Sequence, residues 1–221
     1  IGNLEMAKVS KEEITFYNLD GEEIQKEMKT IEWDAEAAEK AGYEHFMMKE
    51  IHEQPRAVKD TLNSVLKDGK IDLTDIGLAE EDIRRTSQIY IVACGSAYHV
   101  GMVAQYVIED LVKIPVRVEL ASEFRYRKPI LDPNGLVIII SQSGETADSL
   151  AALRETKAQG IRTLGIVNVV GSSIAREADK VFYTLAGPEI SVATTKAYST
   201  QLMASYILAI QFAKVKNTIT E

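Results

Sequence analysis

The segment that decides the fold is LVIII at residues 136–140, followed directly by SQSGET at residues 141–146. The first part is apolar throughout and mostly β-branched, as expected for a strand that is buried on both faces of a parallel sheet. The second part is small and polar, and a helical pattern follows it over residues 145–159. The sequence therefore predicts a strand that ends at Ile140, a short loop, and then a helix.

The same unit recurs along the chain. Further apolar runs occupy residues 89–93, 116–120, 163–167 and 181–185, and their starts lie roughly 20–30 residues apart, as βαβ units require. Helix candidates between them cover residues 97–112, 121–126, 145–159 and 173–178. A last helix, about 194–213, is apolar nearly all round, so it should be buried or lie at an interface. The prediction is an α/β fold: a doubly wound, five-stranded parallel sheet flanked by helices.

The first third of the chain has a different character. Residues 1–32 hold short alternating pieces at 5–9 and 14–19 and predict two or three strands, too few to bury a core of their own. Residues 33–68 have helical spacing, and we expect Pro55 to interrupt the run so that a second helix starts near Gln54. Gly69 is expected to end that helix, and residues 72–81 to form a connector.

Composition excludes several classes of protein. The chain has 25 Lys and Arg against 33 Asp and Glu, a net charge of −8, which argues against nonspecific binding to nucleic acid or to anionic membranes. With 46% hydrophobic residues, the chain is not disordered as a whole. No uncharged apolar run approaches the ~18 residues of a membrane span. The single cysteine, Cys94, excludes an internal disulfide and a Cys-rich zinc site, and a cytoplasmic location is expected.

The loop at residues 141–146 is the candidate binding site. Ligands of open parallel sheets bind beyond the carboxyl ends of the strands, and a helix N-terminus favours anions. Ser141, Ser143 and Thr146 place hydroxyls there, Gly144 lets the backbone approach a ligand, and the loop contains no Lys or Arg. Three or four hydrogen bonds of about 1.5–3 kcal/mol each would hold a phosphomonoester at micromolar to millimolar strength. A Ser/Thr-rich turn that only caps the helix uses the same residue types, so local chemistry leaves both interpretations open.

Other nucleotide-binding patterns are absent from the sequence. After the strand at 89–93, CGSAYHVG stands at residues 94–101 where the Gly-x-Gly-x-x-Gly fingerprint of dinucleotide-binding domains would be, and the chain has no Walker loop. A nucleotide-binding oxidoreductase domain is therefore disfavoured.

Longer motifs carry a resemblance to a known family. SQSGETAD at 141–148 resembles the phosphosugar-binding loop of sugar isomerase (SIS) domains. HFMMKEIHEQP at 45–55, ASEFRYR at 121–127 and EISVATTKA at 189–197 resemble the glutamine–fructose-6-phosphate aminotransferases, also called glucosamine-6-phosphate synthases. The resemblance extends over nearly the whole chain, with the motifs in the same order.

The resemblance implies a division of labour. Enzymes of this family convert fructose 6-phosphate and glutamine to glucosamine 6-phosphate and glutamate without a metal or organic cofactor. By similarity, residues 1–32 correspond to the C-terminal edge of the glutaminase domain and a linker. Residues 33–221 correspond to leading helices and the first isomerase domain, with the second isomerase domain missing. The implied partners are fructose 6-phosphate or glucosamine 6-phosphate, the parent's second isomerase and glutaminase domains, and a second copy in a homodimer.

The resemblance also implies binding residues. In the family, phosphate is held by positions that match Ser141, Gln142, Ser143 and Thr146, with help from Ser96, and the sugar contacts Val192, Ala193 and Thr194. The family usually reads Cys-Gly-Thr-Ser where this chain has CGSA at 94–97, so a hydroxyl is lost at Ala97 and that residue is left out.

No catalytic residue is assigned to this chain. Glu145 falls in the first turn of the predicted helix, where the helix dipole favours a carboxylate, and the family's catalytic glutamate and lysine belong to the second isomerase domain. Cys94 is expected to pack as a small hydrophobe. Two interpretations stay open for the basic cluster of Arg125, Arg127 and Lys128: it attracts the sugar phosphate or a partner domain, or it is solvated or forms salt bridges at an interface. The chain alone should bind sugar phosphate without turnover. The alternative is a phosphosugar-sensing regulatory domain, but such regulators carry a basic helix-turn-helix, which the acidic residues 1–60 lack.

Overall fold

The computed structural model describes residues 1–2, 4–27 and 39–220, and the chain divides into two compact units, Ile1–Glu32 and Trp33–Glu221. The first unit contains a three-stranded antiparallel sheet with the strand order β1-β2-β3. Its strands are β1 (Met6–Val9), β2 (Ile14–Tyr17) and β3 (Glu23–Ile24). The strands expected in this region are therefore present, whereas their assignment to a glutaminase domain stays a prediction.

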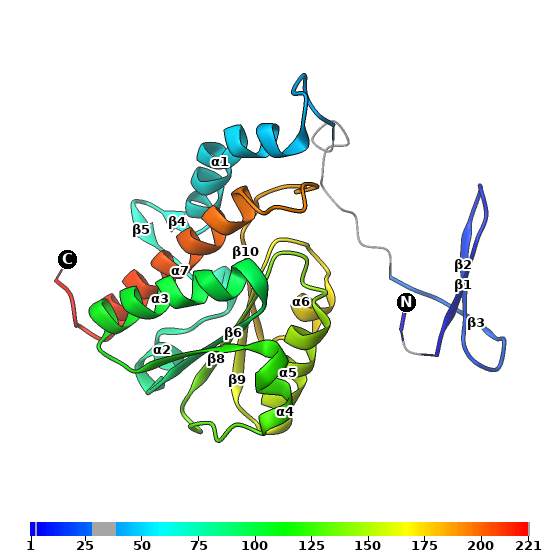
Figure 1. Cartoon of the computed structure of the whole chain (residues 1–221). Helices are drawn as coiled ribbons and strands as arrows, with labels where there is room; N and C mark the ends of the chain where they lie inside the picture. Colours follow the sequence, from blue (N-terminus) through cyan, green and yellow to red (C-terminus); the bar gives the residue numbers. More distant parts are fainter. Residues whose placement is uncertain (3, 28–38, 221) are drawn as a thin grey trace. The chain divides into compact units, whose positions relative to one another are not determined.

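The second unit is built on a five-stranded parallel sheet, which confirms the predicted fold class (Figure 1). Its strands are β6 (Ile89–Ala93), β7 (Val116–Leu120), β8 (Leu136–Ser141), β9 (Arg162–Val167) and β10 (Lys180–Tyr183). Their order is β10-β9-β8-β6-β7, and every neighbouring pair is parallel. The chain runs from β6 outward to β7 and then returns to β8 on the other side of β6. The winding direction therefore reverses between β6 and β8.

Helices cover both faces of this sheet (Figure 1). One face carries α3 (Gly95–Val112) and α7 (Lys196–Val215), and the other carries α4 (Ala121–Arg127), α5 (Ala147–Ala158) and α6 (Ser173–Glu177). The alternation of a strand divides its side chains between the two cores: in β6, Ile89 and Ile91 face the α3 and α7 side, and Tyr90 and Val92 face the other. Burial on both faces explains why β6, and β8 up to Ile140, are apolar.

The last helix, α7, is buried as its apolar composition predicted. It packs against α3 within the larger of the two cores and against α1 (Phe46–Asn63). No helix in the described part of the chain, α7 included, has the length and apolarity to cross a membrane.

The expected break at Pro55 is wrong, because Phe46–Asn63 forms one helix with Pro55 inside it. Proline has no N–H to donate to the carbonyl of Ile51 one turn earlier. The side chain of Gln54 replaces that donor, with Gln54 Nε2 at 3.2 Å from the Ile51 oxygen. The helix bends along its length, as a proline inside a helix produces (Figure 1). The predicted helical range was also too long: residues 39–45 are not helical, and the stretch up to residue 38 lies outside the described residues.

Residues 64–85 differ from the expected helix end and connector. A small hairpin, β4 (Leu66–Lys67) and β5 (Lys70–Ile71), follows α1, and Asp68 and Gly69 form its turn with φ of 49° and 74°. Asp-Gly is a strong signal for such a turn, so Gly69 makes the hairpin rather than ending a helix. A 3-10 turn, η2 (Thr74–Ile76), and a short helix, α2 (Glu80–Arg85), occupy the expected connector and the residues just after it.

Close packing of α3 on the sheet depends on Gly101. A Cβ placed there would lie 2.9 Å from Ile91 Cγ2 and 3.0 Å from Val118 Cγ1. We expect Gly101→Ala to lower the free energy of unfolding by about 1–2 kcal/mol, because overpacking outweighs the better helix propensity of alanine. Denaturant unfolding measures it. In combination with Val118→Ala the two costs should sum to less than their separate values, and strict additivity would show that the clash is not the cause.

Candidate functional site

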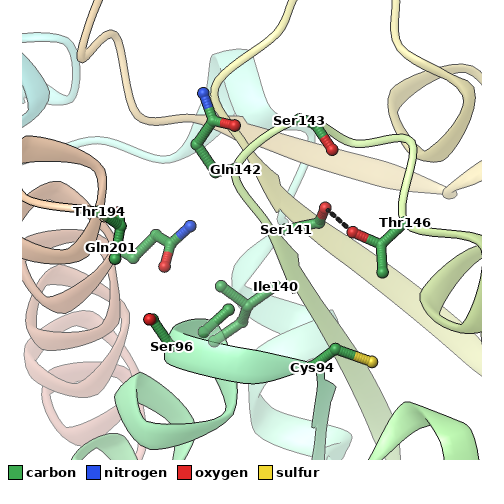
Figure 2. Close-up of a pocket in the computed structure, with 10 residues that line it drawn as sticks. Cys94, Ser96, Ile140, Ser141, Gln142, Ser143, Thr146, Thr194 and Gln201 are labelled. Atoms are coloured by element: carbon green, nitrogen blue, oxygen red, sulfur yellow. Dashed lines mark hydrogen bonds between the residues drawn. The ribbon is translucent and has the colours of Figure 1, made fainter. Parts of the chain in front are cut away.

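A cavity of about 210 Å³ lies at the carboxyl ends of β6 and β8 (Figure 2). These are the two strands between which the winding direction reverses, the position where doubly wound sheets bind ligands. The cavity is lined by hydroxyls and amides over an apolar floor, from Cys94, Ser96, Ala97, Ile140, Ser141, Gln142, Ser143, Thr146, Thr194 and Gln201. None of these ten lining residues carries a formal charge.

Two helix N-termini meet at this cavity. Cys94 is the N-cap of α3 and Thr146 is the N-cap of α5, and neither side chain caps its helix with a hydrogen bond. The first N–H groups of both helices therefore lack a side-chain acceptor from the cap, and both positive dipole ends adjoin the cavity. Since the lining is neutral, these dipoles make the cavity suited to an anion.

The loop between β8 and α5 is held by its own hydroxyls. Ser141 Oγ lies 3.0 Å from Thr146 Oγ1 and accepts the N–H of Gly144 at 3.1 Å, and Ser143 Oγ accepts the N–H of Glu145 at 3.2 Å. Ser143 therefore keeps its own proton for a ligand, and the bonded pair Ser141 and Thr146 keeps one proton between them. The expected helix start near residue 144 or 145 is wrong, since α5 begins at Ala147, and the serine hydroxyls brace the loop rather than cap the helix.

Two features require glycine at position 144: a backbone conformation with positive φ and the close packing of Ser172. Its φ is +65°, and a Cβ there would lie 2.0 Å from Ser172 Oγ and 2.5 Å from Ser172 Cβ. Ser172, the N-cap of α6, is buried, and its hydroxyl has no hydrogen-bond partner among the described residues. The group that lies close to the Gly144 backbone in this structure is therefore the side chain of Ser172.

Thr194 and Gln201 form the cavity wall opposite this loop (Figure 2). Thr194 Oγ1 donates to Glu189 Oε2 at 2.9 Å. Glu189 Oε1 accepts the N–H groups of Thr195 at 3.0 Å and Ala197 at 3.1 Å, which caps α7. The wall therefore has a fixed position relative to α7.

A buried carboxylate of α1 also binds the segment that precedes Thr194. Glu50 is 2% exposed, and its Oε1 accepts the N–H groups of Ile190 at 2.7 Å and Ser191 at 3.1 Å. Further along, Glu53 Oε2 lies 2.6 Å from the ammonium of the buried Lys196 at the start of α7. These contacts give α1, which lies outside the sheet, a part in shaping the cavity.

The structure brings most of the predicted site residues together. Every one lines the cavity except Val192 and Ala193, which are exposed and do not line it, so their contact with a sugar stays a prediction. Four further residues line the cavity although none of them was predicted from the sequence to bind: Cys94, Ala97, Ile140 and Gln201. A polar residue inside the apolar last helix was the one signal for Gln201.

The charged side chains near the loop bind one another or the backbone, and none of them lines the cavity. Arg125 Nη1 lies 2.7 Å from Asp148 Oδ1, and this hydrogen bond raises the pKa of the Arg125 guanidinium. Arg127 pairs with Glu119, which raises its pKa in the same way. Glu145 Oε1 accepts the N–H of Ser173 at 2.7 Å, at the start of α6. Arg125 and Arg127 therefore form salt bridges, whereas Lys128 forms none among the described residues. Glu145 precedes α5 and binds the start of α6, so its predicted place in the first turn of the helix is wrong.

The part of the chain that the structure describes contains no group of three or more His, Cys, Asp or Glu side chains arranged to hold a metal ion. The cavity lining likewise offers hydroxyls, amides and one thiol but no carboxylate or imidazole. The arrangement can therefore bind and orient a small polar anion, and its neutral donors favour a phosphate ester over a metal complex.

Fold and cavity together define a doubly wound α/β domain with a neutral, hydroxyl-lined anion site at its strand ends. The family model described as SIS domain matches residues 82–211. The chain belongs to the SIS domain family.

Within this family, the chain is similar to proteins named as aminotransferases. A glutamine–fructose-6-phosphate aminotransferase (isomerizing) of Clostridium acetobutylicum is 57% identical over 221 residues, 100% of this chain and 36% of that protein. The protein of the same name from Methanosarcina acetivorans is 46% identical over 222 residues, again 100% and 36%. The C-terminal domain of glucosamine-fructose-6-phosphate aminotransferase from Francisella tularensis matches with a TM-score of 0.79 and 49% identity, over 82% of this chain and 51% of that chain. This chain thus spans 36% of the length of these two curated relatives.

Gly144→Ala should lower the free energy of unfolding by about 2–4 kcal/mol, since it adds backbone strain to a clash with Ser172. Gly160→Ala is the matched control, because Gly160 has φ +73° with nothing within 4 Å of an added Cβ, and it should cost only about 1–2 kcal/mol. Urea unfolding of both variants measures the difference. Equal losses would show that Ser172 does not restrict the loop.

Proposed function

We propose that this chain is the fructose-6-phosphate-binding part of an enzyme that converts fructose 6-phosphate and glutamine to glucosamine 6-phosphate and glutamate. The observation that carries the proposal is the neutral cavity where α3 and α5 begin, with the hydroxyls of Ser141, Ser143 and Thr146 on one side. The relatives at 57% and 46% identity, which carry the name of that activity, support the choice of sugar phosphate.

The phosphate is assigned to the loop and the sugar to the opposite wall. A phosphate dianion accepts hydrogen bonds only, so it suits the hydroxyl proton of Ser143, the one proton that the bonded pair Ser141 and Thr146 leaves available, the amide of Gln142 and the N–H groups at the start of α5. The sugar would then extend toward Ser96 and Thr194, with Val192 and Ala193 on its open side. No metal or organic cofactor is needed for this binding.

The remaining parts of the parent enzyme are proposed from the same similarity. We assign residues 1–32 to the C-terminal edge of a glutaminase domain and its linker, and residues 33–221 to the leading helices and first isomerase domain. A second isomerase domain, the glutaminase domain and a second copy in a homodimer are the expected partners. A cytoplasmic location fits an enzyme that uses glutamine and a hexose phosphate.

Binding of fructose 6-phosphate is the direct test. We expect calorimetric titration to give a dissociation constant between micromolar and millimolar, and the double variant Ser143→Ala, Thr146→Ala to weaken it at least about 100-fold, because each hydrogen bond to a charged group contributes about 1.5–3 kcal/mol.

The control for this experiment is Ser122→Ala, on α4 and outside the cavity lining, which should bind like the unmodified chain. Titration with NAD should give no heat of binding. Unchanged affinity in the double variant would move the phosphate away from the loop, and tight NAD binding would favour a nucleotide-binding domain instead.

The chain alone should not form glucosamine 6-phosphate from fructose 6-phosphate and ammonia. Proton transfer between the sugar carbons needs an acid or base within hydrogen-bond reach, and the lining residues include no carboxylate, imidazole or amine. Product assay by mass spectrometry, with a full-length aminotransferase as the positive control, measures this. Sustained product formation by the chain would place a catalytic group within it.

A further inference from the structure

Gln201 is the one buried amide in the cavity wall that none of the recognised motifs contains. It lies on α7, on the opposite side of the cavity from Ser143 and Thr146, and its amide points into the space between them (Figure 2). The residue is only 3% exposed. Its position is set by the helix, which Glu189 caps and which packs against α3 and α1.

The side-chain amide of Gln201 is without a partner among the described residues. Among the residues that the structure describes, none forms a hydrogen bond or another polar contact with it. The amide nitrogen and oxygen are not fully enclosed by protein, because neither is among the buried side-chain atoms that lack a partner. Both atoms are therefore reached from the cavity that Gln201 lines. A buried amide without a partner costs free energy, and native proteins seldom retain one unless a ligand or water completes its hydrogen bonds.

We propose that Gln201 is a specificity-determining residue that binds a hydroxyl of the sugar, an inference that rests on the proposed function. A primary amide both donates and accepts hydrogen bonds, which matches a hydroxyl that does the same. A phosphate oxygen only accepts, so it would leave the amide oxygen of Gln201 unpaired. The loop and the start of α5 already supply the donors that a phosphate needs, on the other side of the cavity.

The neighbours of Gln201 support this division of the cavity. Thr194, beside it in Figure 2, has committed its proton to Glu189, so its oxygen can accept from a sugar hydroxyl. Ser96 contributes a hydroxyl from the first turn of α3, on the same side of the cavity as Gln201. Thr194, Ser96 and Gln201 together form a neutral, polar wall suited to a polyol.

The test compares fructose 6-phosphate with inorganic phosphate, titrated into the full chain and its variants. Gln201→Leu keeps the approximate volume and removes both polar atoms. It should weaken fructose 6-phosphate about 10- to 50-fold and leave the affinity for inorganic phosphate within twofold. Gln211→Leu is the matched control, because it makes the same change on the same helix outside this cavity, and it should alter neither affinity.

Each other outcome overturns the proposal in a different way. Equal loss of both ligands in Gln201→Leu would mean that the substitution distorts the whole cavity, and no loss of either would mean that Gln201 does not touch the ligand. Melting temperatures of both variants separate loss of fold from loss of contact, and Gln201→Asn, which keeps the amide on a shorter side chain, should recover part of the lost affinity. If the unmodified chain binds neither ligand, the proposed function itself fails, which the titration of that chain reveals first.

Discussion

The structure depends on one constraint: two adjacent parallel strands, β6 and β8, end side by side, and a helix starts directly after each of them. Because the winding direction reverses between these strands, α3 and α5 leave toward opposite faces of the sheet and open a space between their first turns. Both helices start without a side-chain cap, so their dipoles adjoin that space. The polarity of the cavity follows from topology before any side chain is chosen.

Neutral side chains can then complete the site because the nearby charges are paired among themselves. The Arg125 guanidinium and the Asp148 carboxylate are bound to each other, and Glu145 binds the backbone at the start of α6. On the other side, Lys196 and Glu53 form a buried pair between α7 and α1. Such a pair adds little net stability, but removing one partner costs about 3–5 kcal/mol, so it fixes how the two helices meet. The cavity wall therefore derives its position from ionic contacts outside it.

The sequence was sufficient to predict features that depend on the pattern of neighbouring residues. The mainly apolar, β-rich runs located all five strands of the parallel sheet, and the small polar loop after Ile140 located the cavity. It was insufficient where the outcome depends on one particular side-chain position in the folded chain. The Gln54 side chain keeps α1 continuous through Pro55, and only the folded chain shows that Gln201 faces the loop from 60 residues away. The hairpin turn at Asp68-Gly69 is different, because its signal was present in the sequence and was outweighed by an apparent helical spacing.

Under the proposed function, the same layout predicts that binding and chemistry are separated. A site built from dipoles, hydroxyls and amides can bind a phosphate ester without a group that must change protonation, so the acid and base for the sugar carbons are expected from another part of the enzyme. Val192, two residues before Thr194, is fully exposed at 104% of its reference area and does not line the cavity. An apolar side chain in that position is suited to cover a bound sugar only when a second surface closes over it. The reacting carbons would then lie at that boundary, where groups from outside this chain can reach them.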